Sequence, residues 1–382
     1  MLSQLQVLRA LYFGYYAQQA ILLPYLPLYF LGKEFDSVQI GILLTAGTFV
    51  AVFIQPVWGY ISDRFQTVKA LIVILWCGTI ITSVGLFTAN GFSATLIFVV
   101  VLYIFLIPSA PLLDSIAIKA AESTGANYGS FRLWGSIGFT LMALISGFIL
   151  RLVGGVENIQ YIYWTVWIIP FLLLIFLKDQ KSEVTTRVTL QAVLTLIKNY
   201  PLLWFMLIVF IIMIPHRMND SLLGVYMQDI GASAQMIGLA WAIAAGSEIP
   251  VFILIYRFMH RYHELSLLFI VSCIYSVRWL VYAFTDNPFI ILILQASHSI
   301  TFAVFWIVAV QYVDRLVPPH LRSTGQSLLS AVFLGLAGLV GGLAGGWLYD
   351  EAGGMAMYMF AVGLAVLSSM LLLFTQLRRK TI

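Results

Sequence analysis

The sequence predicts an all-α membrane protein with twelve transmembrane helices in two pseudo-symmetric halves of six helices each. Hydrophobic residues make up 61% of its 382 residues and charged residues only 9%, whereas ordinary soluble domains carry about 25% charged residues. About a dozen apolar runs fill the chain, each near the roughly twenty residues that a helix needs to cross a bilayer. This composition excludes a water-soluble fold.

Each expected span is an apolar run bounded by polar or charged residues. The spans cover residues 7–32, 37–61, 68–90, 93–120, 128–154, 158–177, 200–228, 233–257, 264–285, 288–316, 321–350 and 354–377. The first run lacks a small-residue cleavage site, so we interpret it as a retained helix and not as a signal peptide. The spans and their short loops leave no room for a soluble catalytic or sensory domain.

One long polar stretch, residues 178–199, divides the chain into an N-terminal six-helix half (1–177) and a C-terminal six-helix half (200–382). We expect the stretch itself to be a cytoplasmic linker. Basic residues concentrate in alternate loops and in the tail, and such residues favour the cytoplasmic side of a membrane. Both termini are therefore expected in the cytoplasm, and the expected state is a monomer in the lipid bilayer.

The two halves resemble repeats. Ser37-Val-Gln39-Ile-Gly41 opens the second expected span, and Ser233-Ala-Gln235-Met-Ile-Gly238 opens the eighth, 196 positions later. Repeated halves are common in secondary transporters, where they place the substrate near the bilayer midplane at the interface of the repeats. The alternative is chance similarity between apolar segments.

A few charged side chains lie inside apolar runs. A charge at the bilayer centre costs about 2.5–3.5 kcal/mol on insertion scales, so such residues rarely lack a function. They are Asp114, Arg132, Arg217, Asp220, Glu248 and Arg278, with His298 nearby. Three positive and three negative charges predict a polar cavity with ion pairs, in a transporter that moves a polar solute with protons.

Several of these charged residues, and His298, have chemical properties that suit transport. Arg132 presents a planar fork of donors suited to carboxylates or paired sugar hydroxyls, and Asp114 could pair with it or accept from a hydroxyl. Glu248 is the expected proton carrier, because burial and the nearby Arg278 act on its protonation in opposite senses. His298 titrates near neutral pH by default. The alternatives are structural ion pairs and a hydrogen-bonded helix contact.

The segment from Pro215 to Asp220 is the most polar one inside any span. His216 and Asp220 are four positions apart and so share a helix face, and Arg217 is spaced to pair with Asp220. Pro215 could kink the helix there. A gate or substrate contact is one interpretation, and an internally satisfied polar kink is the other.

Further candidates for the cavity wall are aromatic and amide side chains. On the first span, Tyr15 and Gln19 share a face, and Tyr12, Tyr16 and Gln18 lie beside them. Trp134 and Trp306 could stack on a sugar ring or an aryl group. Ordinary helix packing is the alternative for each aromatic residue.

The segment Gly59-Tyr-Ile-Ser-Asp63-Arg64 resembles the signature between spans two and three of the major facilitator superfamily. Here Phe65-Gln-Thr-Val-Lys69 follows, with one basic residue and without the second glycine of the family pattern. Gly59 would allow close helix packing, and Asp63 could cap a neighbouring helix N-terminus. The alternative is an ordinary charged turn.

A narrower resemblance concerns the charges. Asp114 and Arg132 on spans four and five, with Glu248, Arg278 and His298 on spans eight to ten, resemble the oligosaccharide/proton symporters typified by lactose permease. The local sequences resemble the phenylpropionate permease-like branch more closely. They are Pro108-Ser-Ala-Pro-Leu-Leu-Asp114-Ser115, Tyr128-Gly-Ser-Phe-Arg132-Leu-Trp134-Gly135-Ser136, Val277-Arg278-Trp279 and His298-Ser-Ile-Thr301-Phe302.

The resemblance implies that the first pair holds the substrate and that the other three residues link it to a proton. One departure is Thr301, which stands where lactose permease carries a second acid. The proton-carrying role would then fall on Glu248 or Asp220.

The resulting hypothesis is a major facilitator transporter of a bacterial cytoplasmic membrane that imports a small organic solute with protons. A sugar, an aromatic monocarboxylate and a nucleoside all remain open, and efflux of amphipathic compounds is the alternative. We expect no enzyme activity, cofactor, metal or nucleic-acid partner, because no phosphate-binding loop, His-Glu-x-x-His or Gly-x-Ser-x-Gly motif is present. An intramembrane enzyme or a sensor would need such a site or a soluble domain.

Overall fold

The computed structural model describes residues 3–65, 67–125, 129–179, 196, 198–259, 261–318 and 321–380. Within these ranges the chain forms helices and the short segments that join them, with no strand. The chain is organised as two compact units. The first consists of Met1–Phe35, Leu43–Thr185 and Met227–Gly246, and the second of Asp36–Ile42, Thr186–Tyr226 and Ser247–Ile382.

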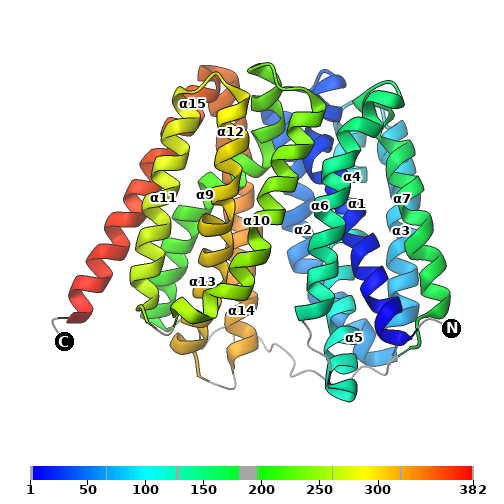
Figure 1. The fold of residues 1–382 in the computed structure, drawn as a ribbon, viewed down its shortest axis with the longest axis horizontal. Helices are drawn as coiled ribbons and strands as arrows, with labels where there is room; N and C mark the ends of the chain where they lie inside the picture. The colour runs from blue at the N-terminus through cyan, green and yellow to red at the C-terminus, as the bar shows by residue number, and fades with distance from the viewer. Residues whose placement is uncertain are drawn as a thin grey trace. The chain divides into compact units, whose positions relative to one another are not determined.

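The first unit is a bundle in which α1 packs against α6 and α7, and α3 packs against α4 (Figure 1). Its helices are α1 (Gln4–Gly32), most of α2 (Ser37–Phe65), α3 (Lys69–Thr88), α4 (Phe92–Leu106), α5 (Ser109–Thr124), α6 (Gly129–Leu152) and α7 (Ile159–Phe176), with the 3₁₀ turn η1 (Val156–Asn158). A capping box starts α1, since the Ser3 hydroxyl accepts from the Gln6 N–H and the Gln6 side chain accepts from the Ser3 N–H.

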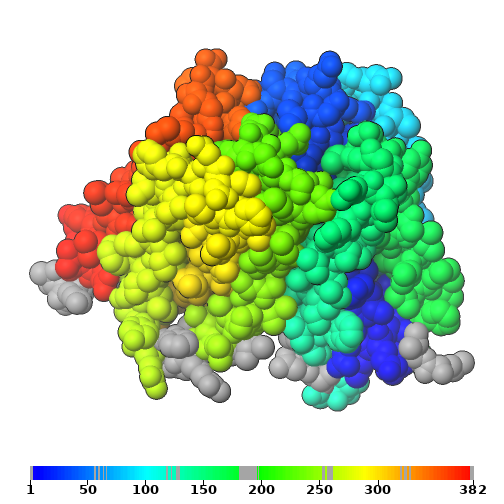
Figure 2. Space-filling model, turned by 45° about the horizontal axis from the view of Figure 1, so that its top comes forward, coloured from blue at the N-terminus to red at the C-terminus, as the bar shows by residue number. Residues whose placement is uncertain are grey.

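The second unit contains the later helices. They are α9 (Tyr200–Asp229), the larger part of α10 (Ala234–Met259), α11 (Glu264–Phe284), α12 (Pro288–Leu294), α13 (Val304–Leu316), α14 (Arg322–Ser330) and α15 (Ala337–Lys380). α15 packs against α11, and its last part, drawn in red, lies beside α11 in both general views (Figure 1, Figure 2). A left-handed backbone at Gly353 (φ 76°) interrupts α15, between the expected spans 321–350 and 354–377.

Two short stretches of this unit depart from α-helical geometry. Between α12 and α13 the chain forms a 3₁₀ turn, η2 (Gln295–Ser297), and then a π-helical turn, η3 (Ser299–Ala303). A second π-helical turn, η5 (Ala331–Leu336), joins α14 to α15. π-helical turns widen a helix locally and are frequent at functional sites, whereas a 3₁₀ turn is tighter than an α-helix.

Nine helical segments among the described residues are long and apolar enough to cross a membrane. Many of their bulky apolar side chains are exposed, for example Ile81, Ile97 and Ile169, as expected for surfaces that contact lipid. The chain is therefore an all-helical protein with membrane-spanning character. The expected spans 7–32 and 233–257 are helices, α1 and α10, but neither is among the nine. The count of twelve spans and the two six-helix halves stay predictions.

The expected linker, residues 178–199, falls largely outside the described residues. Its start is described: the Asp179 carboxylate accepts hydrogen bonds from the N–H groups of Val68 (3.1 Å) and Lys69 (3.0 Å). Asp179 therefore caps the N-terminus of α3, where the helix dipole favours a negative charge. Of the predicted conformational motif, Arg64 is exposed at the end of α2, while the surroundings of Gly59 and the Asp63 side chain lie outside the described part.

Candidate functional site

Two groups of polar side chains, one in each unit, contain the charged residues predicted for substrate binding and proton coupling. The first polar cluster consists of Tyr12, Tyr16, Asp114 and Arg132, from α1, α5 and α6. The Tyr12 hydroxyl donates to Asp114 Oδ1 at 2.5 Å, and the Arg132 guanidinium donates to the Tyr16 hydroxyl oxygen. The guanidinium carbon also lies 5.0 Å from the centre of the Tyr16 ring, within range of a cation–π interaction.

The other residues predicted for the substrate in this unit are placed differently. The Tyr15 hydroxyl donates to the Leu106 carbonyl at 3.0 Å, and its ring stacks on Trp76 at 6.4 Å between centroids. Tyr15 is thus engaged in packing. Gln19 is half-buried one helical turn later, and Trp134 is 41% exposed.

The second polar cluster consists of His216, Arg217, Asp220, Glu248, Arg278 and His298. Its central contact is a carboxylate–imidazole pair, in which Glu248 Oε1 lies 3.1 Å from His298 Nε2. The two side chains are only 17% and 11% exposed. Low exposure strengthens such a pair, because little water competes with the contact.

Among the described residues, the groups that accept hydrogen bonds from Arg278 are neutral. Its guanidinium donates to Gln295 Oε1 (2.6 Å), Thr301 Oγ1 (3.2 Å) and the Tyr282 hydroxyl (3.3 Å). The Trp279 ring centre lies 5.0 Å from its guanidinium carbon. Thr301, which stands where the resemblance would place an acid, therefore supplies an uncharged partner to this arginine.

A second carboxylate–imidazole contact lies on α9. Asp220 Oδ2 is 2.9 Å from Arg217 Nη1 and 3.5 Å from His216 Nε2. These contacts confirm the shared helix face of His216 and Asp220 and the local pairing of Arg217 with Asp220. His216 Nδ1 also lies 3.0 Å from the Tyr275 hydroxyl, so both nitrogens of this imidazole have partners.

Aromatic rings join the two imidazoles. The His216 and His298 rings are 5.5 Å apart between centroids, and Phe302 stacks on both, at 4.9 and 5.3 Å. Phe333, from the π-helical turn η5, lies 5.2 Å from the Trp306 ring and 5.9 Å from the Phe302 ring. Both π-helical turns therefore contribute a ring to this stack.

Several contacts in and around these clusters could not be predicted from the sequence. Tyr12 and Tyr16 were only two of several polar residues on the first span, and nothing distinguished their hydroxyls from that of Tyr15. Gln295 and Phe333 carry no local signal, because their contacts come from neighbouring helices and from non-α turns. Contacts between residues three or four positions apart, such as those of Asp220 with Arg217 and His216 on α9, follow directly from helical spacing.

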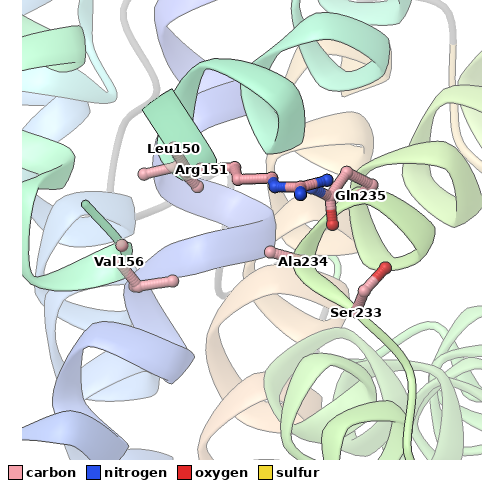
Figure 3. A pocket seen from close by; sticks show the side chains of 7 residues that line it. Leu150, Arg151, Val156, Ser233, Ala234 and Gln235 are labelled. Atoms are coloured by element: carbon pink, nitrogen blue, oxygen red, sulfur yellow. The ribbon is translucent and has the colours of Figure 1, made fainter. Parts of the chain in front are cut away.

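The first unit also contains a cavity of about 410 Å³, lined by residues other than those of the first polar cluster. Its wall is formed by Leu150, Arg151, Gly155, Val156, Ser233, Ala234 and Gln235. The Arg151 side chain extends toward Gln235 across this cavity (Figure 3). None of the predicted site residues lines it.

Comparison with known proteins shows the family of this chain. The model of the MFS_1 like family matches residues 5–360, which is nearly the whole chain. The chain belongs to this family. Its members are integral membrane transporters of the major facilitator superfamily and not enzymes.

Relatives of this chain are named for different solutes. The maltose permease of Geobacillus stearothermophilus is 28% identical over 348 residues, covering 91% of this chain and 88% of the permease. A probable 3-phenylpropionic acid transporter of Escherichia coli (strain K12) is 26% identical, over 92% of this chain and 93% of its own length.

Among solved structures, a crystal structure of the nucleoside transporter NupG has a TM-score of 0.83 to this chain. The match covers 97% of this chain and 98% of that one, at 19% identity. At that identity the likeness concerns the fold alone, and it supports the major facilitator fold expected from the sequence.

Proposed function

We propose that this protein is a secondary active transporter that imports a small polar organic solute together with protons by alternating access. The observation that carries the proposal is the Glu248–His298 pair, a carboxylate and an imidazole 3.1 Å apart and largely shielded from water. A proton added to this pair converts a negatively charged pair into a neutral one. That change alters the electrostatic field acting on its neighbours.

The substrate contacts belong to Asp114 and Arg132, with Trp134, Trp306, Tyr15 and Gln19 as further candidates for the binding surface. Arginine forks and carboxylates suit sugar hydroxyls, and an arginine alone suits a carboxylate. The solute is a sugar or an aromatic carboxylate, in line with the maltose permease and the probable 3-phenylpropionic acid transporter among the relatives.

Coupling belongs to Glu248, Arg278 and His298, with Asp220 and Arg217 as the second charged pair. Gly59, Asp63 and Arg64 act in the conformational change. The protein works as a monomer in the cytoplasmic membrane of a bacterium, with residues 178–199 linking two six-helix halves and both termini in the cytoplasm.

The test is proton uptake into sealed proteoliposomes on addition of maltose, glucose, 3-phenylpropionate or uridine. We expect the outside medium to become alkaline with one solute class, and Glu248→Gln to abolish this signal. Glu351→Gln is the matched control, because Glu351 is exposed on α15 and should leave the signal intact.

Other outcomes have defined meanings. Solute uptake without a proton signal would overturn symport and favour uniport. Proton-driven loss of an amphipathic dye from the vesicles would favour efflux. An alkaline signal with uridine alone would identify a nucleoside symporter, in line with the nucleoside transporter NupG among the similar structures.

A further inference from the structure

Two tyrosines of α1 hold the two charged side chains of the first polar cluster. Tyr12 and Tyr16 are one helical turn apart, so their side chains leave the same face of the helix. Their rings stack at 6.3 Å between centroids and 19° between planes. Tyr12 donates to the carboxylate of α5, and Tyr16 accepts from the guanidinium of α6. One face of α1 therefore contacts both charges.

The hydroxyl group of Tyr16 can donate a further hydrogen bond. Its oxygen accepts from Arg132, while its own hydrogen has no acceptor within the part of the chain that the structure describes. A hydroxyl that accepts from a cation is polarised and becomes a better donor, since chains of hydrogen bonds strengthen one another. An oxygen atom of a solute beside Arg132 would be a suitable acceptor.

Helix α6 leaves room for this tyrosine. A Cβ atom at Gly135 would lie 2.6 Å from Tyr16 Cδ2, which is closer than non-bonded carbon atoms approach. Glycine at this position therefore allows the Tyr16 ring to lie close against α6, about one helical turn from Arg132.

Another tyrosine of α1, Tyr29, has a hydroxyl with a structural role. Tyr29 is buried, and its hydroxyl donates to the Phe87 carbonyl at 3.0 Å. This hydroxyl satisfies a backbone group of a neighbouring segment and has no donor left for a solute. Tyr29 therefore offers a matched control for removal of a hydroxyl from α1.

We propose that Tyr16 is a direct substrate contact that donates its hydroxyl hydrogen to a carboxylate or hydroxyl oxygen of the solute, next to Arg132. Tyr12 is a positioning residue that orients the Asp114 carboxylate through its hydrogen bond. This inference rests on the proposed transport function and adds two residues to the substrate site.

The experiment uses the full chain in proteoliposomes with labelled maltose, 3-phenylpropionate and uridine. Tyr16→Phe should raise KM for the transported solute about tenfold or more, as expected for loss of one hydrogen bond in a charge-assisted set, with Vmax little changed. Tyr29→Phe should leave KM within about twofold, as expected for a site without a role in binding.

The positioning role of Tyr12 is tested by equilibrium binding in a double-mutant cycle. Tyr12→Phe should weaken binding of the same solute in the wild-type background but have no further effect in Asp114→Ala, which lacks the acceptor oxygen, because the two changes act through one contact. Equal effects in both backgrounds would overturn the positioning role, since a general loss of structure would be additive.

The outcomes separate this inference from the proposed function. A wild-type protein that takes up none of the three solutes overturns both. A wild-type protein that transports one of them while folded Tyr16→Phe keeps its KM overturns the substrate contact alone. Gly135→Ala gives an independent check, because displacing the Tyr16 ring should raise KM in the same direction.

Discussion

Arg278 is a fully buried cation whose hydrogen-bond partners within the described chain are all uncharged. It is 1% exposed, and three neutral oxygen atoms accept its hydrogen bonds. Burying a charge is costly unless hydrogen bonds replace water, so each of these acceptors contributes to folding. The shortest contact, to Gln295, is the most informative one to remove.

We expect Gln295→Leu to lower the free energy of unfolding by about 1.5–3 kcal/mol, the range for hydrogen bonds to charged groups. Thermal unfolding of the purified protein in detergent measures the change. Ser297→Ala is the control, because the Ser297 hydroxyl donates to the Leu294 carbonyl of its own turn. Equal stability of the two variants would show that Gln295 is not needed to bury the arginine.

At the scale of single residues, the sequence predicted contacts within a helix better than contacts between helices. The Arg217–Asp220 pair follows from a spacing of three residues, and the structure contains it at 2.9 Å. Glu248 was expected beside Arg278, whereas among the described residues its carboxylate lies 3.1 Å from the His298 imidazole. The rotation of each helix about its axis decides such pairs, and hydropathy does not encode that rotation.

At the scale of elements, the start of α2 is fixed by a residue of α15. The Asp350 carboxylate accepts from the N–H groups of Ser37 (3.1 Å) and Val38 (2.9 Å). Both groups lie in the first turn of α2, where N–H groups lack partners in the helix and a negative charge is favoured. A residue more than three hundred positions away thus adds to the local cap of this helix, in which the Asp36 carboxylate accepts from the Gln39 N–H at 2.7 Å.

Replacing Asp350 with alanine should cost about 1–2 kcal/mol, as for loss of other charged N-caps. The amides of Ser37 and Val38 should exchange with solvent faster, which hydrogen-exchange mass spectrometry can detect. Glu351→Ala should change neither quantity. Unchanged exchange in Asp350→Ala would contradict the capping role.

Close approach between α6 and the start of α10 depends on glycine. A Cβ atom at Gly147 would lie 2.7 Å from the Ala234 carbonyl oxygen and from Gln235 Cα, and backbone atoms cannot move aside as a side chain can. Gly147→Ala should therefore destabilise the protein by about 1–3 kcal/mol. Gly363→Ala, where no atom lies within 4 Å, should not, and thermal unfolding compares them.

The helices themselves were largely predictable, because an apolar run of sufficient length in a membrane has few alternatives to a helix. Local departures from the α-helix were not. The turns η2 and η3 lie within one expected span, 288–316, and place Gln295 and Thr301 against Arg278. Nothing in the hydropathy of that run distinguishes a π-helical turn from an α-helical one.

At the scale of the whole molecule, composition alone indicated an all-helical membrane protein, and the charged residues inside apolar runs indicated transport. The family match over residues 5–360 agrees with both. Substrate choice was not predictable, because the same acid and arginine types suit sugars, acids and nucleosides. Under the proposed function, we expect discrimination among these to depend on the exact placement of a few hydroxyl and ring groups such as Tyr16 and Trp306.

The balance of the charges inside the apolar runs has an electrical consequence. Asp114, Asp220 and Glu248 offset Arg132, Arg217 and Arg278, so the empty protein carries no net formal charge on these groups when both histidines are neutral. A neutral sugar with one proton would then cross as a net positive charge, and each 100 mV of membrane voltage would contribute about 2.3 kcal/mol to its movement.

A monocarboxylate with one proton would cross with no net charge. If maltose is the transported solute, we expect its uptake to generate an inward current across a solid-supported membrane. If 3-phenylpropionate is transported with a single proton, we expect uptake without a current. Maltose uptake without a current, or a current with 3-phenylpropionate, would contradict a one-proton stoichiometry. With one proton per solute, the membrane voltage drives the uptake of a neutral sugar and has no effect on the uptake of a monocarboxylate.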